Sequence, residues 1–361
     1  MSSDREYMRL ALKLGAKGKG STFPNPPVGA VIVKDSEIIG RGWHSRRGEA
    51  HAEVRAIADA EVNHKDTSGA TMFVTLEPCC HHGITPPCTE AIIAAGISRV
   101  VVSCRDDCDE RVCGMGIARS QEAGLKVETG ILNEEGRELI EQYVVQRKKK
   151  RAFLSAKWAQ SLDGRIATKS GKSKWITNER SRKYAHLLRS QHGAVAVGAK
   201  TAMLDDPELT VRMVRSHHTP ARIIIAGDSK LPSSIKLLSG GPRTIVVHSD
   251  TNPVSGDVLD KVEFLKIPSG PRFWEKLLQK LPHMDIGSVL LEGGSETLTS
   301  AFKAGAVDRI YCFIAPKIIG EGIEAIGDLG IDKLDKSLRL DNVRRLKLGD
   351  DVLITGRIRR T

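Results

Sequence analysis

Four residues in the first third of the chain have the types and spacing of a zinc-dependent hydrolytic centre. His51 and Glu53 are separated by one residue, and Cys79 and Cys88 follow them along the chain. One imidazole and two thiolates can hold Zn²⁺ and leave its fourth position open to water. The metal lowers the pKa of that water toward about 7, and a nearby carboxylate can carry its proton to a departing amine. The pattern predicts a deaminating centre with His51, Cys79 and Cys88 as ligands and Glu53 as the catalytic acid–base.

Each of these residues also has a plainer interpretation when it is taken alone. His51 could cap a helix, Glu53 could be a first-turn carboxylate favoured by the helix dipole, and the cysteines could be buried thiols. Their order, beside strand and helix patterns, favours the zinc centre. Cys80 adjoins Cys79 and could exchange with it, or supply the fourth ligand of a purely structural site. Three further cysteines lack the spacing of a second zinc site and are interpreted as loop thiols: Cys104, Cys108 and Cys113.

Alternating strand and helix patterns supply the elements that would position these residues. Buried strands are predicted over Val28–Val33, Met72–Leu76 and Arg99–Ser103, with helices over His51–Val62 and Thr89–Ala95. The alternation continues in the second half. Strands are predicted there over Phe153–Trp158, Ala194–Val197, Arg222–Ala226, Thr244–His248, Val289–Glu292 and Arg309–Ile314, and helices over Glu179–Ser190, Phe273–Leu281 and Glu296–Lys303. These patterns predict two α/β domains.

A basic run, Arg147–Arg151, lies between the two halves. We interpret it as a solvated helix end or linker, and a nucleic-acid patch is the weaker alternative. The predicted domain boundary falls near this run, with one domain over residues 1–147 and the other over 152–361.

Several longer motifs resemble one enzyme family over nearly the whole chain. In the first half they are Pro24-Asn25-Pro26-Pro27-Val28-Gly29, His51-Ala52-Glu53, Leu76-Glu77-Pro78-Cys79 and Thr85-Pro86-Pro87-Cys88. In the second half they are residues 161–167 (SLDGRIA), 175–177 (WIT), 205–212 (DDPELTVR) and 291–294 (LEGG). Together they resemble the bifunctional riboflavin deaminase–reductase family. The resemblance implies an α/β protein with an N-terminal cytidine-deaminase-like three-layer α/β/α domain and a C-terminal dihydrofolate-reductase-like α/β domain.

The same resemblance implies two successive reactions and two cofactors, Zn²⁺ and NADPH. A 2,5-diamino-6-ribosylamino-4(3H)-pyrimidinone 5′-phosphate would lose its 2-amino group by hydrolysis, and its ribosyl group would then be reduced to ribityl. Residues implied on the cofactor side of the reductase are Ala159, Trp175, Thr201, Asp205 and Ser229. Residues implied on the substrate side are Lys157, Ser173, Arg189, Leu209, Arg212 and Glu292, with Asn25 in the deaminase pocket. Arginines suit this role because a guanidinium can hold a phosphate through two hydrogen bonds.

Gly294 and Ser295 follow a predicted strand and open a predicted helix. Backbone N–H groups at such a helix start can approach a pyrophosphate, although the same residues also suit a tight turn. No G-x-G-x-x-G fingerprint accompanies them, so the reductase interpretation depends mainly on the resemblance.

The chain departs from the family pattern at two places near the zinc motif. Ile84 stands where the family usually has a basic residue, and Asp107–Glu110 replaces an Asp-Pro-Asn-Pro stretch. A carboxylate at Asp109 would repel a nearby phosphate. One hypothesis is therefore a deaminase half with weakened or altered substrate recognition, or a chain that acts only as a reductase.

The formal net charge is +11, which would suit nucleic acid, an anionic surface or phosphorylated small molecules. Aromatic residues make up only 4% and are not interleaved with basic clusters, so a base-stacking platform is not expected. A nucleic-acid base deaminase with an appended binding domain is kept as the alternative function. No apolar run approaches the roughly 20 residues of a membrane span, and residues 1–19 do not have a signal-peptide pattern. We expect a cytoplasmic enzyme with a small phosphorylated substrate, no nucleic-acid or membrane partner and, from the resemblance, a homo-oligomeric assembly.

Overall fold

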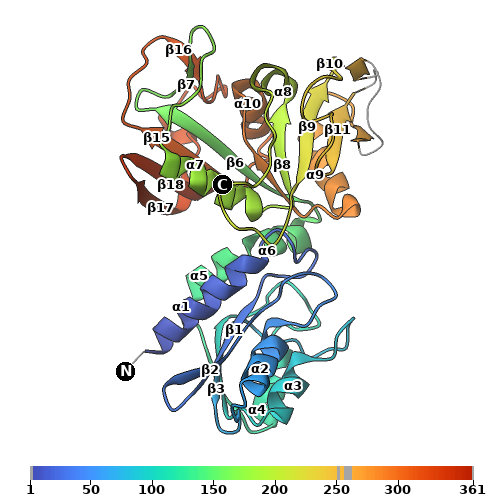
Figure 1. Cartoon of the computed structure of the whole chain (residues 1–361), viewed down its shortest axis with the longest axis vertical. Helices are drawn as coiled ribbons and strands as arrows, with labels where there is room; N and C mark the ends of the chain where they lie inside the picture. The colour runs from blue at the N-terminus through green and yellow to red at the C-terminus, as the bar shows by residue number, and fades with distance from the viewer. Residues whose placement is uncertain (1–2, 250–252, 256–261, 360–361) are drawn as a thin grey trace. The chain divides into compact units, whose positions relative to one another are not determined.

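The computed structural model describes residues 3–249, 253–255 and 262–359. They form two compact units, and the division falls between Lys150 and Arg151 (Figure 1). Within the described residues, no helix combines the length and the apolar character that a membrane crossing requires.

The first unit is built on a five-stranded sheet in the order β2-β1-β3-β4-β5. Its strands are β1 (Gly29–Lys34), β2 (Glu37–Trp43), β3 (Thr71–Leu76), β4 (Arg99–Cys104) and β5 (Lys126–Thr129). β1 runs antiparallel to both of its neighbours, whereas β3, β4 and β5 are parallel. The sheet is therefore mixed, with a hairpin at one edge and three parallel strands beside it.

Helices cover both faces of this sheet. They are α1 (Asp4–Gly15), α2 (Ala52–Val62), α3 (Cys88–Ala94), α4 (Met115–Glu122), α5 (Asn133–Leu139) and α6 (Glu141–Lys149), with a 3₁₀ turn over Ala16–Gly18. Alternate residues of β1 enter different apolar clusters. Val31 packs in a cluster with residues of α1, and Ile32 packs in a cluster with residues of α2 and α3. In Figure 1, α1 and α2 lie on opposite sides of β1. Helices thus cover both faces of the sheet, which is the predicted three-layer α/β/α arrangement. A strand covered on both faces needs apolar residues at every position, and this explains the continuous apolar run of β1.

Close packing brings α2 against the sheet at β2. A Cβ atom at Gly42 would collide with the carbonyl oxygen of Ala52, the first residue of α2. A glycine is thus required where the helix start approaches the strand. The contact fixes the position of His51 and Glu53 at the start of α2.

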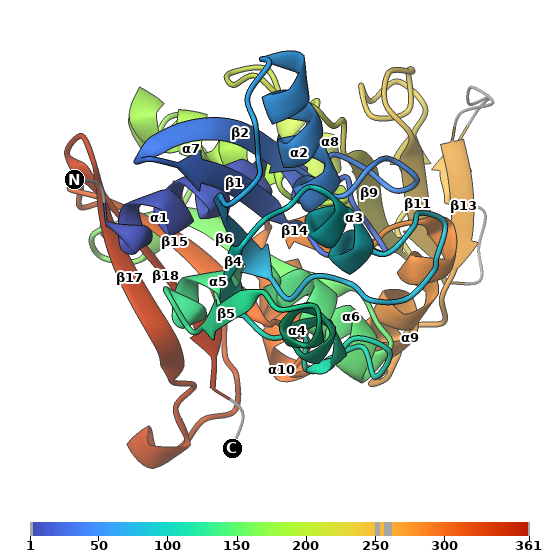
Figure 2. The ribbon, with the colours of Figure 1, turned by 90° about the horizontal axis from the view of Figure 1, so that it is seen from below.

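The second unit contains a nine-stranded sheet in the order β13-β11-β9-β8-β14-β6-β15-β18-β17. The strands are β6 (Phe153–Ser161), β8 (Ala194–Gly198), β9 (Ala221–Gly227), β11 (Thr244–His248), β13 (Val262–Lys266), β14 (Ser288–Leu291), β15 (Arg309–Ala315), β17 (Leu340–Leu348) and β18 (Asp351–Ile358). All neighbours are parallel except the pairs made by β18. In Figure 2, β13 and the β17–β18 hairpin lie at opposite margins of this unit.

Helices and short strand pairs complete the second unit. The helices are α7 (Glu179–Ser190), α8 (Ala199–Asp205), α9 (Phe273–Lys280) and α10 (Ser295–Lys303), with 3₁₀ turns over Leu281–Met284 and Leu334–Lys336. The short pairs are β7 (Arg165–Thr168) with β16 (Gly322–Glu324) and β10 (Leu231–Pro232) with β12 (Val254–Ser255). Separate apolar clusters on alternate residues of β8 show that helices also cover both faces of this sheet. The predicted α/β class is confirmed for both halves.

The basic run between the halves has two different environments. α6 ends at Lys149, and Lys148 and Lys150 are exposed, as expected for a solvated helix end. Arg151 is buried, with two guanidinium hydrogen bonds to the carboxylate of Asp308 at 2.7 and 2.8 Å. The interpretation as a solvated run is therefore wrong at Arg151, which begins the second unit through a buried ion pair.

Candidate functional site

The three predicted metal ligands converge in the first unit. The ligand atoms of His51, Cys79 and Cys88 all lie within 4.8 Å of one another. His51 precedes α2 as its N-cap, Cys79 follows β3, and Cys88 is the first residue of α3. His51 Nδ1 lies 3.2 Å from Cys88 Sγ and 3.6 Å from Cys79 Sγ. One imidazole nitrogen and two sulfurs at the ends of three rigid elements fit the ligand preference of Zn²⁺.

Hydrogen bonding favours a thiolate at this cluster. The Cys88 backbone N–H donates to Cys79 Sγ at 3.4 Å. The hydrogen bond from the Cys88 thiol is the main cause that lowers the pKa of Cys79 to about 4, and it outweighs burial. A thiolate is the form of cysteine that binds metal.

Glu53 lies in the first turn of α2 and is only 4% exposed. Burial raises its pKa to about 7, and the Cys79 sulfur contributes in the same direction. A carboxyl group with a pKa near neutrality can both accept and donate a proton at neutral pH. Its position beside the cluster fits the catalytic role expected from the sequence.

Cys80 does not join the metal cluster. Its Sγ instead lies 3.5 Å from the carbonyl oxygen of Arg111. The cluster found in the described residues therefore has three protein ligands, the number expected for an open catalytic site rather than a closed structural one.

Asn25 is held beside the cluster by His44. His44 Nδ1 lies 3.3 Å from the carbonyl oxygen of Ala50, which can only accept, so this nitrogen carries the proton. Burial is the largest of the causes that lower the pKa of His44 to about 4, so the ring is neutral and its Nε2 is an acceptor. The Asn25 amide donates to that Nε2 at 3.2 Å. The Oδ1 atom of Asn25 then remains available to accept a hydrogen bond from a ligand.

The structure describes both positions at which the chain departs from the family pattern. Ile84 is exposed. The carboxylate of Asp109 accepts two hydrogen bonds from the Arg111 guanidinium at 2.9 and 2.7 Å and lies 3.1 Å from Arg147. The Arg111 hydrogen bonds lower the pKa of Asp109 to about 2. Two guanidinium groups therefore compensate its charge, which reduces the repulsion that Asp109 would exert on a phosphate.

Glu77 is a buried carboxylate to which the sequence reasoning gave no role. It accepts four backbone N–H groups and joins the loop after β4 to the Pro78-Cys79 segment. Oε2 accepts from Asp106 and Gly114 at 3.3 and 3.1 Å, and Oε1 accepts from Gly116 and Ile117 at 3.1 and 3.3 Å. Only its place in the Leu-Glu-Pro-Cys motif could have indicated this role.

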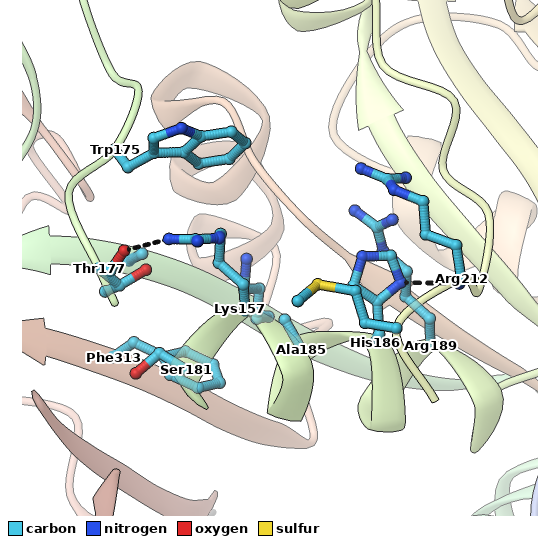
Figure 3. Close-up of a pocket in the computed structure, with 12 residues that line it drawn as sticks. Lys157, Trp175, Thr177, Ser181, Ala185, His186, Arg189, Arg212 and Phe313 are labelled. Carbon is cyan, nitrogen blue, oxygen red and sulfur yellow. Dashed lines mark hydrogen bonds between the residues drawn. The ribbon is translucent and has the colours of Figure 1, made fainter. Parts of the chain in front are cut away.

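A cavity of about 330 Å³ lies in the second unit. Five of its lining residues were predicted: Lys157, Ala159, Trp175, Arg189 and Arg212. Seven were not: Thr177, Ser181, Arg182, Ala185, His186, Met213 and Phe313. In Figure 3 Arg189, Arg212 and His186 gather at one end, Trp175 and Thr177 lie at the other, and Lys157 stands between them. We call the end with Arg189, Arg212 and His186 the basic end and the end with Trp175 the aromatic end, where Arg182 lies 4.6 Å over the Trp175 ring.

A buried ion-pair network links β6, α7 and β14 at the cavity. Arg189 donates from Nε and Nη2 to the Glu292 carboxylate at 2.6 and 2.8 Å and from Nη1 to the Thr210 carbonyl at 2.9 Å. Lys157 Nζ lies 3.8 Å from Glu292. Burial would raise the pKa of Glu292, but Arg189 and Lys157 outweigh it and bring the value to about 2. Glu292 is thus held as a carboxylate, and burial lowers the pKa of Lys157.

The other residues implied on the cofactor side lie at the carboxyl ends of neighbouring parallel strands. Thr201 and Asp205 are in α8 after β8, and Gly294 and Ser295 begin α10 after β14. A Cβ atom at Gly294 would lie 3.0 Å from Thr201 Oγ1, so the two helix starts are adjacent. Ser229 follows β9, the next strand of the sheet. On the substrate side, Leu209 is buried and Ser173 is half-buried.

Comparisons with known proteins match both units. Residues 1–104 match the family described as the cytidine and deoxycytidylate deaminase zinc-binding region, and residues 152–354 match the RibD C-terminal domain. The riboflavin biosynthesis protein RibD of Aquifex aeolicus is 45% identical over 97% of both chains. That of Escherichia coli is 36% identical over 97% of this chain and 98% of its own.

Solved structures of the same family also match this chain over nearly its full length. A Thermotoga maritima protein described as a diaminohydroxyphosphoribosylaminopyrimidine deaminase/5-amino-6-(5-phosphoribosylamino)uracil reductase is 35% identical, with a TM-score of 0.83 over 98% of both chains. One crystal form of Acinetobacter baumannii RibD gives a TM-score of 0.81 at 32% identity over 99% of both chains.

Proposed function

The chain belongs to the RibD family of bifunctional riboflavin-biosynthesis deaminase–reductases, and on that premise we propose how its residues divide the two activities. Zinc serves the deaminase and NADPH serves the reductase. The proposed deaminase domain comprises residues 1–147 and the proposed reductase domain residues 152–361. The compact units that divide after Lys150 support this assignment.

The proposed deaminase substrate is the 2,5-diamino-6-ribosylamino-4(3H)-pyrimidinone 5′-phosphate, in line with the description of the Thermotoga relative. His51, Cys79 and Cys88 would hold zinc, which when bound supplies an activated water. Glu53 accepts the proton of the attacking water and returns it to the leaving amine, so that the 2-amino group leaves as ammonia and a carbonyl remains. The Oδ1 atom of Asn25 accepts a hydrogen bond from the pyrimidine. The observation that carries this proposal is the convergence of the three ligands beside the buried Glu53.

The proposed second step reduces the ribosyl carbonyl form of the deaminated product to a ribityl chain. NADPH when bound supplies the hydride. Thr201, Asp205, Ser229, Gly294 and Ser295 are proposed to hold the cofactor along the carboxyl ends of the parallel strands, with Ala159 and Trp175 at the cavity. Lys157 stands between the basic and aromatic ends of the cavity, where its ammonium can stabilise the developing alkoxide (Figure 3).

The basic end of the cavity suits the substrate phosphate. Arg189 and Arg212 both line it, and the side chain of Arg212 is 54% exposed. Guanidinium groups match phosphate oxygens in geometry and charge. Glu292 orients Arg189 through two hydrogen bonds, and Ser173 and Leu209 are assigned to the same substrate.

Both proposed reactions act on a small molecule and require no nucleic acid or membrane. We therefore propose no nucleic-acid partner and no membrane partner. A cytoplasmic location and a homo-oligomeric assembly also stay proposals. Cell fractionation with antibody detection tests the first, and light scattering of the purified protein tests the second.

The decisive experiment follows ammonia release and NADPH absorbance separately in the zinc-loaded protein. Glu53→Gln is run beside the wild type. We expect the variant to lose ammonia release and to keep NADPH oxidation when deaminated substrate is supplied. A wild type that oxidises NADPH with deaminated substrate and releases no ammonia from the diamino substrate would instead establish a reductase-only chain.

A further inference from the structure

His186 lies at the basic end of the cavity, although no sequence motif singled it out. It belongs to α7, one turn before Arg189, and lines the cavity with Arg189 and Arg212. Figure 3 shows its ring beside the side chains of both arginines. The role of the His186 ring depends on which of its two nitrogens carries the proton.

The backbone of Arg212 fixes that proton position. Its N–H donates to His186 Nδ1 over 3.2 Å (Figure 3). A backbone N–H can only donate, so Nδ1 must carry a lone pair and the proton of the neutral ring is on Nε2. A doubly protonated ring would place one N–H against another. Burial, followed by the charges of Arg189 and Arg212, also lowers the pKa of His186 to about 4.

The Nε2–H group of His186 is available to a ligand. The Arg212 contact is the one hydrogen bond that His186 makes within the part of the chain described. The charged groups near the ring are Arg189, Arg212, Lys157 and Glu292. Three of these four are cations, so an anionic or electron-rich oxygen is the ligand that this donor would meet.

The two neighbouring arginines differ in how many of their N–H donors are free to bind a ligand. Arg189 already gives three hydrogen bonds to Glu292 and Thr210, so its charge is largely compensated and its free donors are few. Arg212 carries the charge at this end and is only loosely paired, 3.5 Å from the exposed Glu208. A phosphate monoester has three terminal oxygens, and a guanidinium fork donates two parallel hydrogen bonds, so a further donor can bind the same group.

We propose that His186 is a third phosphate-binding residue of the reductase site, which donates from Nε2 to the 5′-phosphate of the substrate. The inference deepens the proposed function and rests on it. A neutral donor adds a hydrogen bond without a further buried positive charge. It also keeps that bond across the whole pH range in which the ring stays neutral.

The test compares His186→Gln with His186→Phe in the full-length protein. Glutamine can accept from the Arg212 N–H through its oxygen and donate through its amide, whereas phenylalanine can do neither. We expect His186→Phe to raise KM for the deaminated substrate about 10- to 100-fold, the range for one lost hydrogen bond to a charged group, and His186→Gln to recover most of it. KM for NADPH should not change. Leu187→Gln, on the outward-facing next position of α7, is the matched control.

A dephosphorylated substrate identifies the group that His186 contacts. If His186 binds the phosphate, removal of the phosphate raises KM in the wild type by a larger factor than in His186→Phe. An equal factor in both proteins would overturn the proposal, because His186 would then contact another part of the substrate. An unchanged KM in His186→Phe would overturn it as well.

Binding of inorganic phosphate separates this proposal from the proposed function. Calorimetric titration needs no turnover, and His186→Phe should bind phosphate more weakly than the wild type and His186→Gln. A wild-type protein without NADPH oxidation would contradict the reductase function alone. Equal phosphate binding in all three proteins would contradict the role of His186 alone.

Discussion

Replacement of Glu77 by glutamine should weaken zinc binding, although Glu77 touches no metal ligand directly. Its two carboxylate oxygens each accept two backbone N–H groups. A glutamine amide keeps one oxygen and replaces the other by an NH₂ group. Whichever way the amide is turned, two backbone donors then face another donor. The buried site has no orientation that satisfies all four.

The size of the effect follows from this count. Two hydrogen bonds to a charged group are lost, at about 1.5–3 kcal/mol each, and part of that loss is relieved by movement of the loop after β4. Glu77 anchors this loop to the Pro78-Cys79 segment. The part of the free-energy loss that loop movement does not relieve should therefore displace Cys79 from its position as a ligand. Loss of a group hydrogen-bonded to a metal ligand typically lowers metal affinity about 10- to 100-fold. Because Glu77 acts one step further away, through the position of Cys79, we expect Glu77→Gln to lie near the lower end, at about 10-fold.

Competition with a chromophoric chelator measures zinc affinity without turnover. Glu122→Gln, an exposed substitution on α4, is the control. Circular dichroism establishes that both variants are folded. Zinc affinity of folded Glu77→Gln within twofold of the wild type would refute the reasoning, since the carboxylate would then not position Cys79.

Four further predictions concern stability, pH and metal. Gly42→Ala should destabilise the first unit by about 1–3 kcal/mol, because its Cβ collides with the Ala52 carbonyl, and urea denaturation measures this. Asp308→Asn should cost about 3–5 kcal/mol in the second unit, because it leaves the buried Arg151 without a counter-charge, and the same denaturation assay shows it. The pKa of Glu292 is lowered from 4.5 to about 2, so its contribution to stability is present above pH 4.5 and lost as pH falls toward 2. Acid titration of the second unit should show this loss in the wild type and not in Glu292→Gln. Removal of zinc with a chelator should abolish ammonia release and spare NADPH oxidation with deaminated substrate, as separate assays of the two activities would show.

Local sequence signals predicted the elements that carry the metal ligands. Apolar runs predicted β3 and β4 because their strands are buried on both faces, and the two prolines before Cys88 marked the start of α3. The β17–β18 hairpin was not predicted. Most of β17 is exposed and polar at the sheet edge, so its sequence lacks a strand-like apolar pattern.

Local sequence signals could not predict contacts between distant parts of the chain. Arg147, which compensates Asp109, lies 38 positions away on α6, and no spacing rule connects the two. His186 owes its fixed tautomer to the backbone of Arg212, and Glu77 owes its role to four N–H groups of another segment. A motif gives the residue type at a position. The partner that decides the protonation state or orientation of the side chain comes from the fold.

Two buried glutamates illustrate the same principle with opposite outcomes. Glu53 and Glu292 are both nearly inaccessible to solvent, and burial alone raises the pKa of each. Glu53 has a sulfur neighbour of like charge, and its pKa rises to about 7, where a carboxyl group can transfer protons. Glu292 has Arg189 at 2.6 Å and Lys157 at 3.8 Å, and its pKa falls to about 2, where it stays ionised and orients a guanidinium. The same side chain is therefore a proton carrier in one domain and a fixed charge in the other, and the cations within about 4 Å account for the difference.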